Sequence, residues 1–555
     1  MRTARVATFS NRAEQEGEAY LVLVARPETS GGDVATRGAR LVRAMYRPEL
    51  HVGRLRPLRD GDASLAAAAV AGAAGCVVLT IALASGQLVG PGLASIGAAG
   101  FVLLVIWCFA HRPVQHSLAV LTLYLGLLDG YLKLRTGSST VTLARDVLVV
   151  AVAAGALLRS TRAHRTFVLP PLAGFVLAFC GVVLIELANP GSRGLTAGLA
   201  GVRQHLEFVP LFFLGYAFLR KESQIRNALL LIVFCAAVGG VVSYIQSRLS
   251  PAQLASWGPG YAERINGTGI FTGAGRVAFL SGGTAVRPFG LGSDAGSGAA
   301  TASLALPGAA ALMMTAGSRT RWFVALMSVG IALAVATSGS RAAIIVSFVS
   351  LLTFALLAAV SKNALKAIVG TAVGIALVYL AFVQLGPNNA TTQRAQSITP
   401  NNFSSTFSNE RSASVGLLGS LMVSHPLGVG VGTSGPAAQV AGDAGAAKYN
   451  SETEWNFLVV ETGIVGLVIY VAFLCRLAWL SASRIRRFSE ARLRLCLAAL
   501  AAPILSMLVS GFSGPTSASV PTAPFLWLVS GVLAYWLIKE PRGRGGGRGR
   551  GRTSR

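Results

Sequence analysis

Three glutamates stand at the entrance of one strongly apolar segment of the sequence, "YNSETEWNFLVVETGIVGLVIYVAFL": Glu452, Glu454 and Glu461. A charged side chain at the centre of a bilayer costs about 2.5 to 3.5 kcal/mol even on insertion scales, so this placement needs a reason. A partly desolvated carboxylate has the chemistry of a general base. Glu452 and Glu454 are therefore candidate catalytic bases. The alternative for each is an ordinary interfacial glutamate that pairs with an arginine or caps a helix start.

Four arginines lie at the mouths of apolar segments: Arg203 in "GVRQHLEF", Arg287 in "VRPFGLGSDAGSG", Arg341 in "TSGSRAAIIV" and Arg411 in "NERSAS". A guanidinium group presents a planar pair of donors that suits phosphate oxygens, and several converging arginines would hold a pyrophosphate. The alternative is that each one snorkels to the membrane interface. Arg341 is favoured because the small residues "SGS" before it leave room for a headgroup.

Other residues near the glutamates have structural or secondary interpretations. His425 is an alternative base, although the His-Pro pair it belongs to indicates a helix end and a turn. Glu461 is expected to bind an arginine or backbone groups, and Gly463 to allow close helix packing. The run "GVGTSG" from Gly430 to Gly435 has the G-x-G-x-x-G spacing but follows no predicted strand. It is either a flexible turn or a set of backbone amides that forms an anion nest.

Two further acidic residues, Asp129 and Asp146, lie inside apolar segments, where charged side chains by default mark functional or paired groups. Lys133 follows Asp129 by one helical turn, and Arg145 neighbours Asp146. Local ion pairs are the simpler explanation of these residues.

The composition indicates the class of protein that must position these residues. Of the 555 residues, 53% are hydrophobic and only 13% are charged, and the mean hydropathy is +0.60. Soluble globular proteins carry about twice that share of charge, so the sequence predicts a polytopic membrane protein. The net charge of +26 would suggest nucleic acid in a soluble protein. Here the arginines lie mostly at the chain ends and in short loops, which argues against a nucleic-acid partner.

The apolar stretches predict an all-α, polytopic membrane helical bundle of about 12–14 transmembrane helices, since each span needs about 20 apolar residues. Fourteen candidate spans can be read at approximately 64–85, 90–110, 116–133, 142–158, 166–186, 204–219, 227–247, 297–317, 321–337, 341–360, 365–385, 455–475, 494–512 and 518–538.

Orientation follows from the positive-inside rule, and every Lys- and Arg-rich short loop becomes cytoplasmic when both termini are placed inside. The same assignment creates long extracytoplasmic loops at about 248–296 and 386–454. Residues 1–60 are expected to be a disordered cytoplasmic region, 61–540 the transmembrane domain and 541–555 a basic Arg-Gly cytoplasmic tail. We expect the tail to fix topology and to touch anionic membrane lipids. The localisation predicted is a bacterial cytoplasmic (inner) membrane.

The second long loop contains the stretch "NERSASVGLLGSLMVSHPLGVGVGTSG", in which Val415, Leu418 and Met422 recur at helical spacing before a Pro- and Gly-rich stop. This pattern predicts an amphipathic helix that lies on the membrane surface or caps a cavity.

Three motifs in this order, "TSGSRAAIIV", "RSASVGLLGSLMVSHPLGVGVG" and "ETEWNFLVVETGIVGL", resemble those of the O-antigen ligase and O-antigen polymerase superfamily of integral-membrane glycosyltransferases. The resemblance covers about Arg203 to Gly466. It implies polyprenyl-pyrophosphate-linked glycan donors at the outer leaflet, arginines that bind the pyrophosphate, and no metal or other cofactor. That role carries over most directly to Arg341 and Arg287, and less directly to Arg411 and Arg203.

The sequence departs from this family at the proposed base. The ligases typically carry a histidine nine positions before the glutamate of the E-x-G-x-x-G element, whereas counting back nine from Glu461 gives Glu452. Loss of that histidine favours a polymerase that joins lipid-linked repeats into cell-surface or extracellular polysaccharide, with flippase and chain-length proteins as partners. The alternatives are ligase-type transfer to a separate acceptor, a transporter of a lipid-linked or anionic substrate, and a structural scaffold of the cell envelope.

Overall fold

The computed structural model describes most of the apolar part of the chain. The residues described are 49–50, 91–111, 113–137, 140–162, 167–192, 194–266, 277–280, 283–358, parts of 369–384, 412–440, 453–512, 514 and 516–538. Three predicted segments lie outside them: the span at 64–85, the basic tail, and the disordered region at 1–60 except for a two-residue strand. So do most of the predicted loop at 386–454 and, within it, Arg411 and Glu452.

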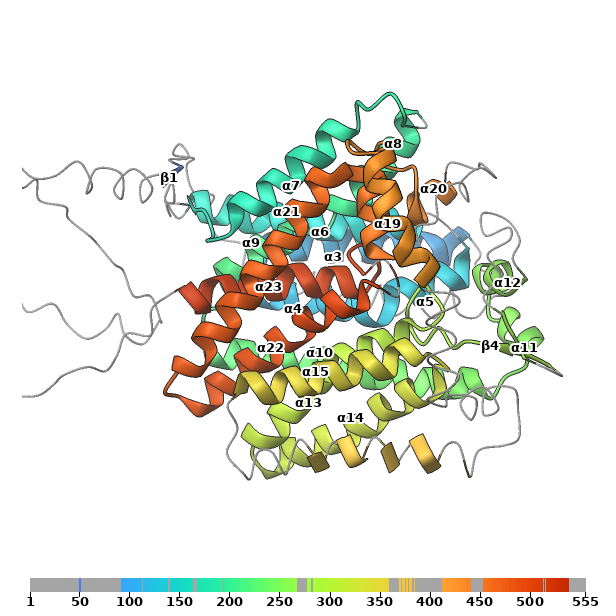
Figure 1. The fold of residues 1–555 in the computed structure, drawn as a ribbon. Helices are drawn as coiled ribbons and strands as arrows, with labels where there is room; N and C mark the ends of the chain where they lie inside the picture. Colours follow the sequence, from blue (N-terminus) through green and yellow to red (C-terminus); the bar gives the residue numbers. More distant parts are fainter. Residues whose placement is uncertain are drawn as a thin grey trace, which may run out of the picture. The chain divides into compact units, whose positions relative to one another are not determined.

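The described chain is almost entirely helical (Figure 1). Its first half forms α3 (Pro91–Ala110), α4 (Val114–Leu123), the π-helix η1 (Tyr124–Leu128), α5 (Asp129–Thr136), α6 (Thr140–Arg162), α7 (Ala173–Glu186), α8 (Leu195–Leu206), α9 (Val209–Phe218) and α10 (Glu222–Ser247). Its second half forms α11 (Pro251–Ala255), α12 (Pro259–Asn266), α13 (Ser297–Thr315), α14 (Ser318–Thr337), α15 (Arg341–Ala358), α19 (Ser412–Ser424), α20 (Gly435–Val440), α21 (Glu454–Arg484), the 3₁₀ turn η5 (Ile485–Arg487), α22 (Ala491–Ser510) and α23 (Thr522–Ile538). The strands are short: β1 (Glu49–Leu50), β2 (Phe167–Val168), β3 (Val277–Leu280) and β4 (Gly283–Val286).

Within the described residues, seven helices are long and apolar enough to cross a membrane. They run from Val114–Thr136, Val141–Arg162, Glu222–Ser247, Ser297–Thr315, Ser318–Thr337, Glu454–Arg487 and Ala491–Ser510. Shorter apolar helices accompany them, among them α7, α15 and α23. The predicted class, an all-α polytopic membrane bundle, is therefore confirmed.

One predicted span differs from the structure in a way that matters for the site. The stretch at 204–219 was expected as a single helix, but the chain breaks at Glu207 and Phe208, between α8 and α9. A Pro at the start of α9 is compatible with a fresh helix beginning there. Glu207 lies in this break, directly after α8, and its side chain bonds to Arg145 of α6.

Small residues let the helices approach closely. In the pair formed by α9 and α23, a Cβ added at Gly531 would lie 1.9 Å from the carbonyl oxygen of Phe212, and one at Gly215 would lie 2.2 Å from that of Leu528. Gly240 of α10 approaches the carbonyl oxygen of Gly330 in α14 in the same way. Such contacts are typical of membrane bundles, where close backbone packing replaces the hydrophobic effect as the source of helix association.

The predicted outer loop at 248–296 has secondary structure of its own. It contains α11, α12 and the antiparallel β3–β4 hairpin, in which Val277 pairs with Val286 and Leu280 with Gly283. A small separate core of Leu254, Tyr261 and Phe289 holds this region together. Since α12 packs against α5, the loop covers one end of the bundle (Figure 1).

The predicted amphipathic helix forms as α19, which ends at Ser424, directly before the His425–Pro426 pair. Leu418 and Met422 pack against the main core, whereas Val423 is 84% exposed. The helix lies along α21 (Figure 1), so its apolar face is used for packing within the bundle.

Replacement of Gly531 by Ala tests the close packing of α9 on α23. We expect Gly531→Ala to lower the stability by about 1–3 kcal/mol, because the methyl group has no room beside the Phe212 carbonyl. The matched control is Gly181→Ala in α7, where nothing lies within 4 Å of an added Cβ. Thermal unfolding of the purified protein in detergent checks both: equal melting temperatures for the two variants would contradict the packing described.

Candidate functional site

The last turn of α8 and the residue after it connect three other helices. Among four nearly consecutive polar residues, Arg203 and Glu207 bond to α6, Gln204 to α20 and His205 to α21. Helical geometry sends neighbouring side chains in different directions, about 100° apart, so a polar run here reaches several partners at once. By the predicted topology this turn lies at the outer end of the bundle.

Glu207 binds Arg145 of α6 through two parallel hydrogen bonds. The distances are 2.5 Å from Nε to Oε1 and 2.6 Å from the second guanidinium nitrogen, Nη2, to Oε2. The remaining terminal nitrogen of Arg145 lies 3.2 Å from Oδ2 of Asp129, at the start of α5, and the guanidinium also lies over the ring of Phe208 at 5.3 Å. Arg145 is buried, so one arginine compensates two buried carboxylates.

Arg203 forms a bidentate pair with Asp146. Its Nε lies 2.6 Å from Oδ2 and its Nη2 3.1 Å from Oδ1, with 34% and 22% of the two side chains exposed. Asp146 in turn lies 3.7 Å from Nε of Arg145, which links the two ion pairs. The arginine that the sequence suggested for pyrophosphate binding thus has a carboxylate partner of its own, at the most exposed edge of this charge cluster.

His205 and Glu461 form a fully buried pair in which Nε2 lies 2.8 Å from Oε2. The imidazole stacks on the ring of Phe457, with the ring centres 5.1 Å apart. The other carboxylate oxygen of Glu461 accepts hydrogen bonds from the backbone N–H groups of Gly432, at 3.1 Å, and Ser434, at 2.9 Å. Glu461 therefore joins α8 and α21 to the loop that follows α19.

That loop contains the "GVGTSG" run, and its glycines explain how its N–H groups can donate to the Glu461 carboxylate. Gly430, Gly432 and Gly435 all have positive φ angles, 103°, 79° and 65°, which favour glycine and turn successive N–H groups inward. A Cβ added at Gly432 would lie 1.9 Å from the carbonyl oxygen of Ala197 in α8, so no larger residue fits. The amides form an anion nest of the kind the sequence suggested, and its anion is an internal carboxylate.

A break in α21 brings the same loop against that helix. Gly463 has φ 65° and ψ −171°, which are not helical, and α21 bends there. A Cβ added at Gly463 would lie 2.7 Å from the Pro426 carbonyl oxygen. Hydrogen bonds from the Val429 N–H to the Val460 carbonyl and from the Ile464 N–H to the Pro426 carbonyl, 2.7 and 2.9 Å long, join the two segments on either side of the bend.

Glu454, the first residue of α21, is buried with 1% of its surface exposed. Thr453 caps the helix by accepting the Asn456 N–H at 3.1 Å. Oε2 of Glu454 accepts the N–H of Ser517, at 3.0 Å, and the hydroxyl of Thr516, at 3.4 Å. Oε1 has no hydrogen-bond partner in the described part of the chain. A buried carboxylate oxygen without a donor is costly, and this cost makes it a candidate site of chemistry.

The other candidate residues are only partly placed. Arg287 follows β4 and is half-buried. His425 directly follows α19, and its N–H donates to the Leu421 carbonyl at 2.8 Å. Arg341 is the first residue of α15, and the Ser340 hydroxyl before it accepts the Ala343 N–H at 3.4 Å. The side chain of Arg341 lies outside the described part of the chain, and so do Arg411 and Glu452.

The sequence did not indicate the partners that Arg145 contacts most closely. It expected local pairs of Asp129 with Lys133 and of Arg145 with Asp146. The second pair is present at 3.7 Å, but Arg145 lies closer to Asp129 and Glu207, which come from other segments. The signal for Glu207 was present, because "RQHLE" places several polar residues together in an apolar stretch. No local pattern identifies which distant residue such a side chain will meet.

Neither models of known protein families nor curated protein sequences match this chain. Among the described residues, no group of three or more His, Cys, Asp or Glu side chains is placed to hold a metal ion.

Arg145→Met tests whether the charge cluster supports the fold. Removing one member of a buried ion pair leaves uncompensated carboxylates at Asp129 and Glu207, which typically costs 3–5 kcal/mol. We expect a lower melting temperature and less folded protein in membranes. The double variant Arg145→Met with Glu207→Leu should recover part of the loss, because one buried charge is removed with its partner. A single variant as stable as the wild type would contradict this role.

Glu461→Ala tests the connection between α8, α21 and the glycine loop. The change leaves two backbone N–H groups without an acceptor, each worth about 1–3 kcal/mol when buried. Glu461→Gln is the matched control, because its amide oxygen still accepts both N–H groups. We expect the Ala variant to melt well below the Gln variant, and the glycine loop to be cleaved faster by protease. Equal melting temperatures would show that the nest does not stabilise the protein.

Proposed function

We propose that the protein is a membrane glycosyltransferase that uses a polyprenyl-pyrophosphate-linked oligosaccharide as donor at the outer leaflet of a bacterial cytoplasmic membrane, with both termini cytoplasmic. The observation that carries the proposal is the buried Glu454, whose Oε1 is unpaired among the described residues, on the helix that also bears the E-x-G-x-x-G element. The resemblance of the motifs to the O-antigen ligase and polymerase superfamily supplies the reaction class.

The reaction we propose is a direct displacement at the anomeric carbon. The acceptor hydroxyl attacks that carbon, the bond to the pyrophosphate oxygen breaks, and polyprenyl pyrophosphate leaves with inversion of configuration. The proton of the hydroxyl passes to a carboxylate, for which Glu454 Oε1 is free of other hydrogen bonds among the described residues. Glu452, two residues earlier and outside the described residues, stays the second candidate base.

Arginines would balance the charge of the pyrophosphate leaving group, whose negative charge grows as the bond breaks. Arg287 and Arg341 are the first candidates, because the motif resemblance assigns them this role. The ion pair with Asp146 reduces the charge that Arg203 can offer, so Arg203 is a weaker candidate. Arg411 is also weaker, because the motif resemblance assigns it this role less directly.

Polymerisation of lipid-linked repeats is the form of the reaction that we favour, because the ligase-type histidine is absent nine residues before Glu461. The acceptor would then be a second lipid-linked repeat, and flippase and chain-length proteins would be its partners. Transfer to a separate anchor is the alternative within this class. Transport remains the alternative outside it, favoured by the buried charges of Asp129, Arg145 and Glu207 within the bundle.

Glu454→Gln tests the base. General acid–base catalysis contributes about 10²–10⁴-fold, so we expect transfer to fall at least about 100-fold while donor binding changes little. The isosteric amide keeps the acceptor for the Ser517 N–H, which protects the fold. Glu490→Gln, an exposed glutamate just before α22, is the matched control and should keep full activity. Wild-type turnover by the Gln variant at an unchanged melting temperature would exclude Glu454 as the base.

A further inference from the structure

An arginine between α9 and α10 is held in place by two aromatic rings. The Arg220 guanidinium lies over the ring of Tyr216, 5.7 Å from its centre, and over the ring of Tyr535, 5.0 Å from its centre. Its Nε donates to the Tyr216 carbonyl at 3.3 Å, and its backbone N–H donates to the Gln224 side chain at 2.9 Å. Arg220 is therefore held at both its backbone and its side chain, although the residue is exposed.

These contacts leave one edge of the Arg220 guanidinium open. Stacking occupies the faces of the group and Tyr216 engages Nε, so the terminal nitrogens Nη1 and Nη2 remain as a pair of donors. Neither nitrogen forms a hydrogen bond or an ion pair with a described residue. Glu222, the nearest acidic residue along the chain, interacts with Arg226 and Arg492 instead. The paired donors at the end of an arginine match two oxygens of a phosphate group.

The aromatic residues around Arg220 indicate its depth in the membrane. Tyr216 lies in the last turn of α9, and Tyr535 and Trp536 lie in the last turn of α23. The two helices pack side by side (Figure 1), and Nε1 of Trp536 donates to the Leu219 carbonyl at 3.1 Å. Tyrosine and tryptophan are enriched at the two interfaces of a bilayer, where their rings lie at the level of the headgroups. Arg220 therefore lies where the phosphates of lipids lie.

Other basic residues accompany Arg220 at this end of the bundle. Lys221 follows it directly and is exposed, and Arg484 of α21 donates to the Leu537 carbonyl at the end of α23, at 2.7 Å. The sequence after α23, "KEPRGRGGGRGRGRTSR", adds seven basic residues and one acidic residue. Basic residues beside the end of a membrane span attract anionic lipids.

We infer that Arg220 and the rings of Tyr216 and Tyr535 form a binding site for an anionic phospholipid. The phosphate lies on the two terminal nitrogens of Arg220, and the acyl chains lie in the bilayer. A soluble phosphate shares the headgroup chemistry, but the aromatic residues set the arginine at the bilayer surface, which makes a lipid the occupant. By the predicted topology the lipid belongs to the cytoplasmic leaflet.

This inference does not depend on the proposed function, because the two sites lie at opposite ends of α23. Glu454 bonds to Ser517, shortly before α23 begins, whereas Arg220 contacts Tyr535, shortly before the helix ends. Absence of sugar transfer by the wild-type protein would therefore remove the proposed function and leave the phospholipid site standing.

A lipid titration of the purified, delipidated full-length protein tests the site. Phosphatidylglycerol or phosphatidylcholine is added in detergent, and native mass spectrometry counts the lipid bound to the folded protein. We expect the first phosphatidylglycerol to bind more tightly than phosphatidylcholine, whose choline group is repelled by the basic residues. Glycerol 3-phosphate at the same concentration should not displace the phosphatidylglycerol. Displacement by glycerol 3-phosphate would overturn the inference, and so would equal affinity for the two lipids.

Variants separate the built site from the net charge of the protein. Arg220→Gln should weaken the first phosphatidylglycerol at least about tenfold, because hydrogen bonds to a charged group are lost. Arg220→Lys keeps the charge without the paired donors, and Tyr535→Leu keeps the arginine without one of its rings. Each of these two should weaken the lipid about threefold or more.

Arg248→Gln is the matched control at the other end of α10. The Arg248 guanidinium also lies over a tyrosine ring, that of Tyr244 at 4.8 Å, but it donates to the hydroxyl of the same tyrosine at 2.6 Å. This variant loses the same net charge as Arg220→Gln and should bind phosphatidylglycerol like the wild type.

Each outcome of the variant series decides for or against the site. Wild-type affinity in a folded Arg220→Gln protein would overturn the inference. An equal loss of affinity in Arg220→Gln and Arg248→Gln would show that only net charge matters, and would overturn it as well. If Arg220→Gln does not fold, Arg220→Lys and Tyr535→Leu decide the question, and wild-type affinity in both would overturn the site.

Discussion

The pairing of Glu207 with Arg145 at the break between α8 and α9 is the interaction on which the rest of this end of the bundle depends. An unpaired carboxylate inside an apolar bundle is expensive, and the bidentate geometry at 2.5 and 2.6 Å compensates it. Once the break is fixed, His205 reaches Glu461 and Gln204 reaches the N–H of Ala437 in α20. One turn of helix therefore orients α6, α21 and the glycine loop together.

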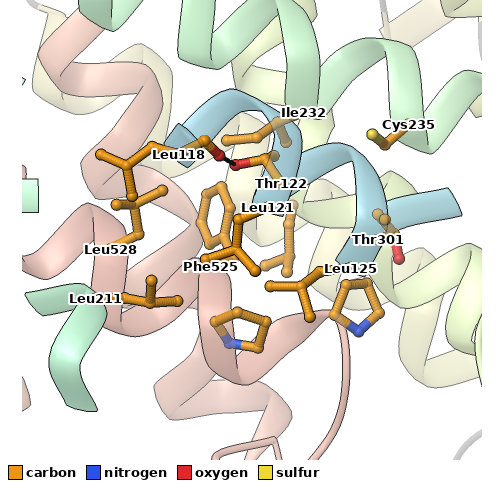
Figure 2. A pocket seen from close by; sticks show the side chains of 14 residues that line it. Leu118, Leu121, Thr122, Leu125, Leu211, Ile232, Cys235, Thr301, Phe525 and Leu528 are labelled. Carbon is orange, nitrogen blue, oxygen red and sulfur yellow. Dashed lines mark hydrogen bonds between the residues drawn. The ribbon is translucent and has the colours of Figure 1, made fainter. Parts of the chain in front are cut away.

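Apolar residues and charged residues occupy different parts of the bundle. Apolar and small residues make the helix contacts and leave a carbon-lined cavity between α4 and α23 (Figure 2). The charged residues gather at the end where α5, α8 and the start of α21 meet. Most of their charge is neutralised internally. Among the described residues, Oε1 of Glu454 has no hydrogen-bond donor, and it is the atom to which we assign the proton of the acceptor.

Sequence reasoning predicted the helical class well because each span is a local property: about 20 apolar residues are enough to indicate one. It missed the break at Glu207 because the polar run "RQHLE" marks an unusual stretch but does not say where the helix ends. It left open whether Glu461 binds an arginine or backbone groups, and that choice depends on a loop near residue 432 and on His205, 256 positions away. Its candidate base Glu452 and Arg411 lie outside the described residues, so their roles stay predictions.

The central claim is that the bundle transfers a glycan from a polyprenyl pyrophosphate. The most direct measurement is a gel of the products formed by the purified protein in liposomes that carry a lipid-linked oligosaccharide from its own host. The account predicts a ladder of lengthening chains and release of polyprenyl pyrophosphate. No covalent product, with the oligosaccharide found on the opposite side of the bilayer, would contradict it and make the protein a transporter.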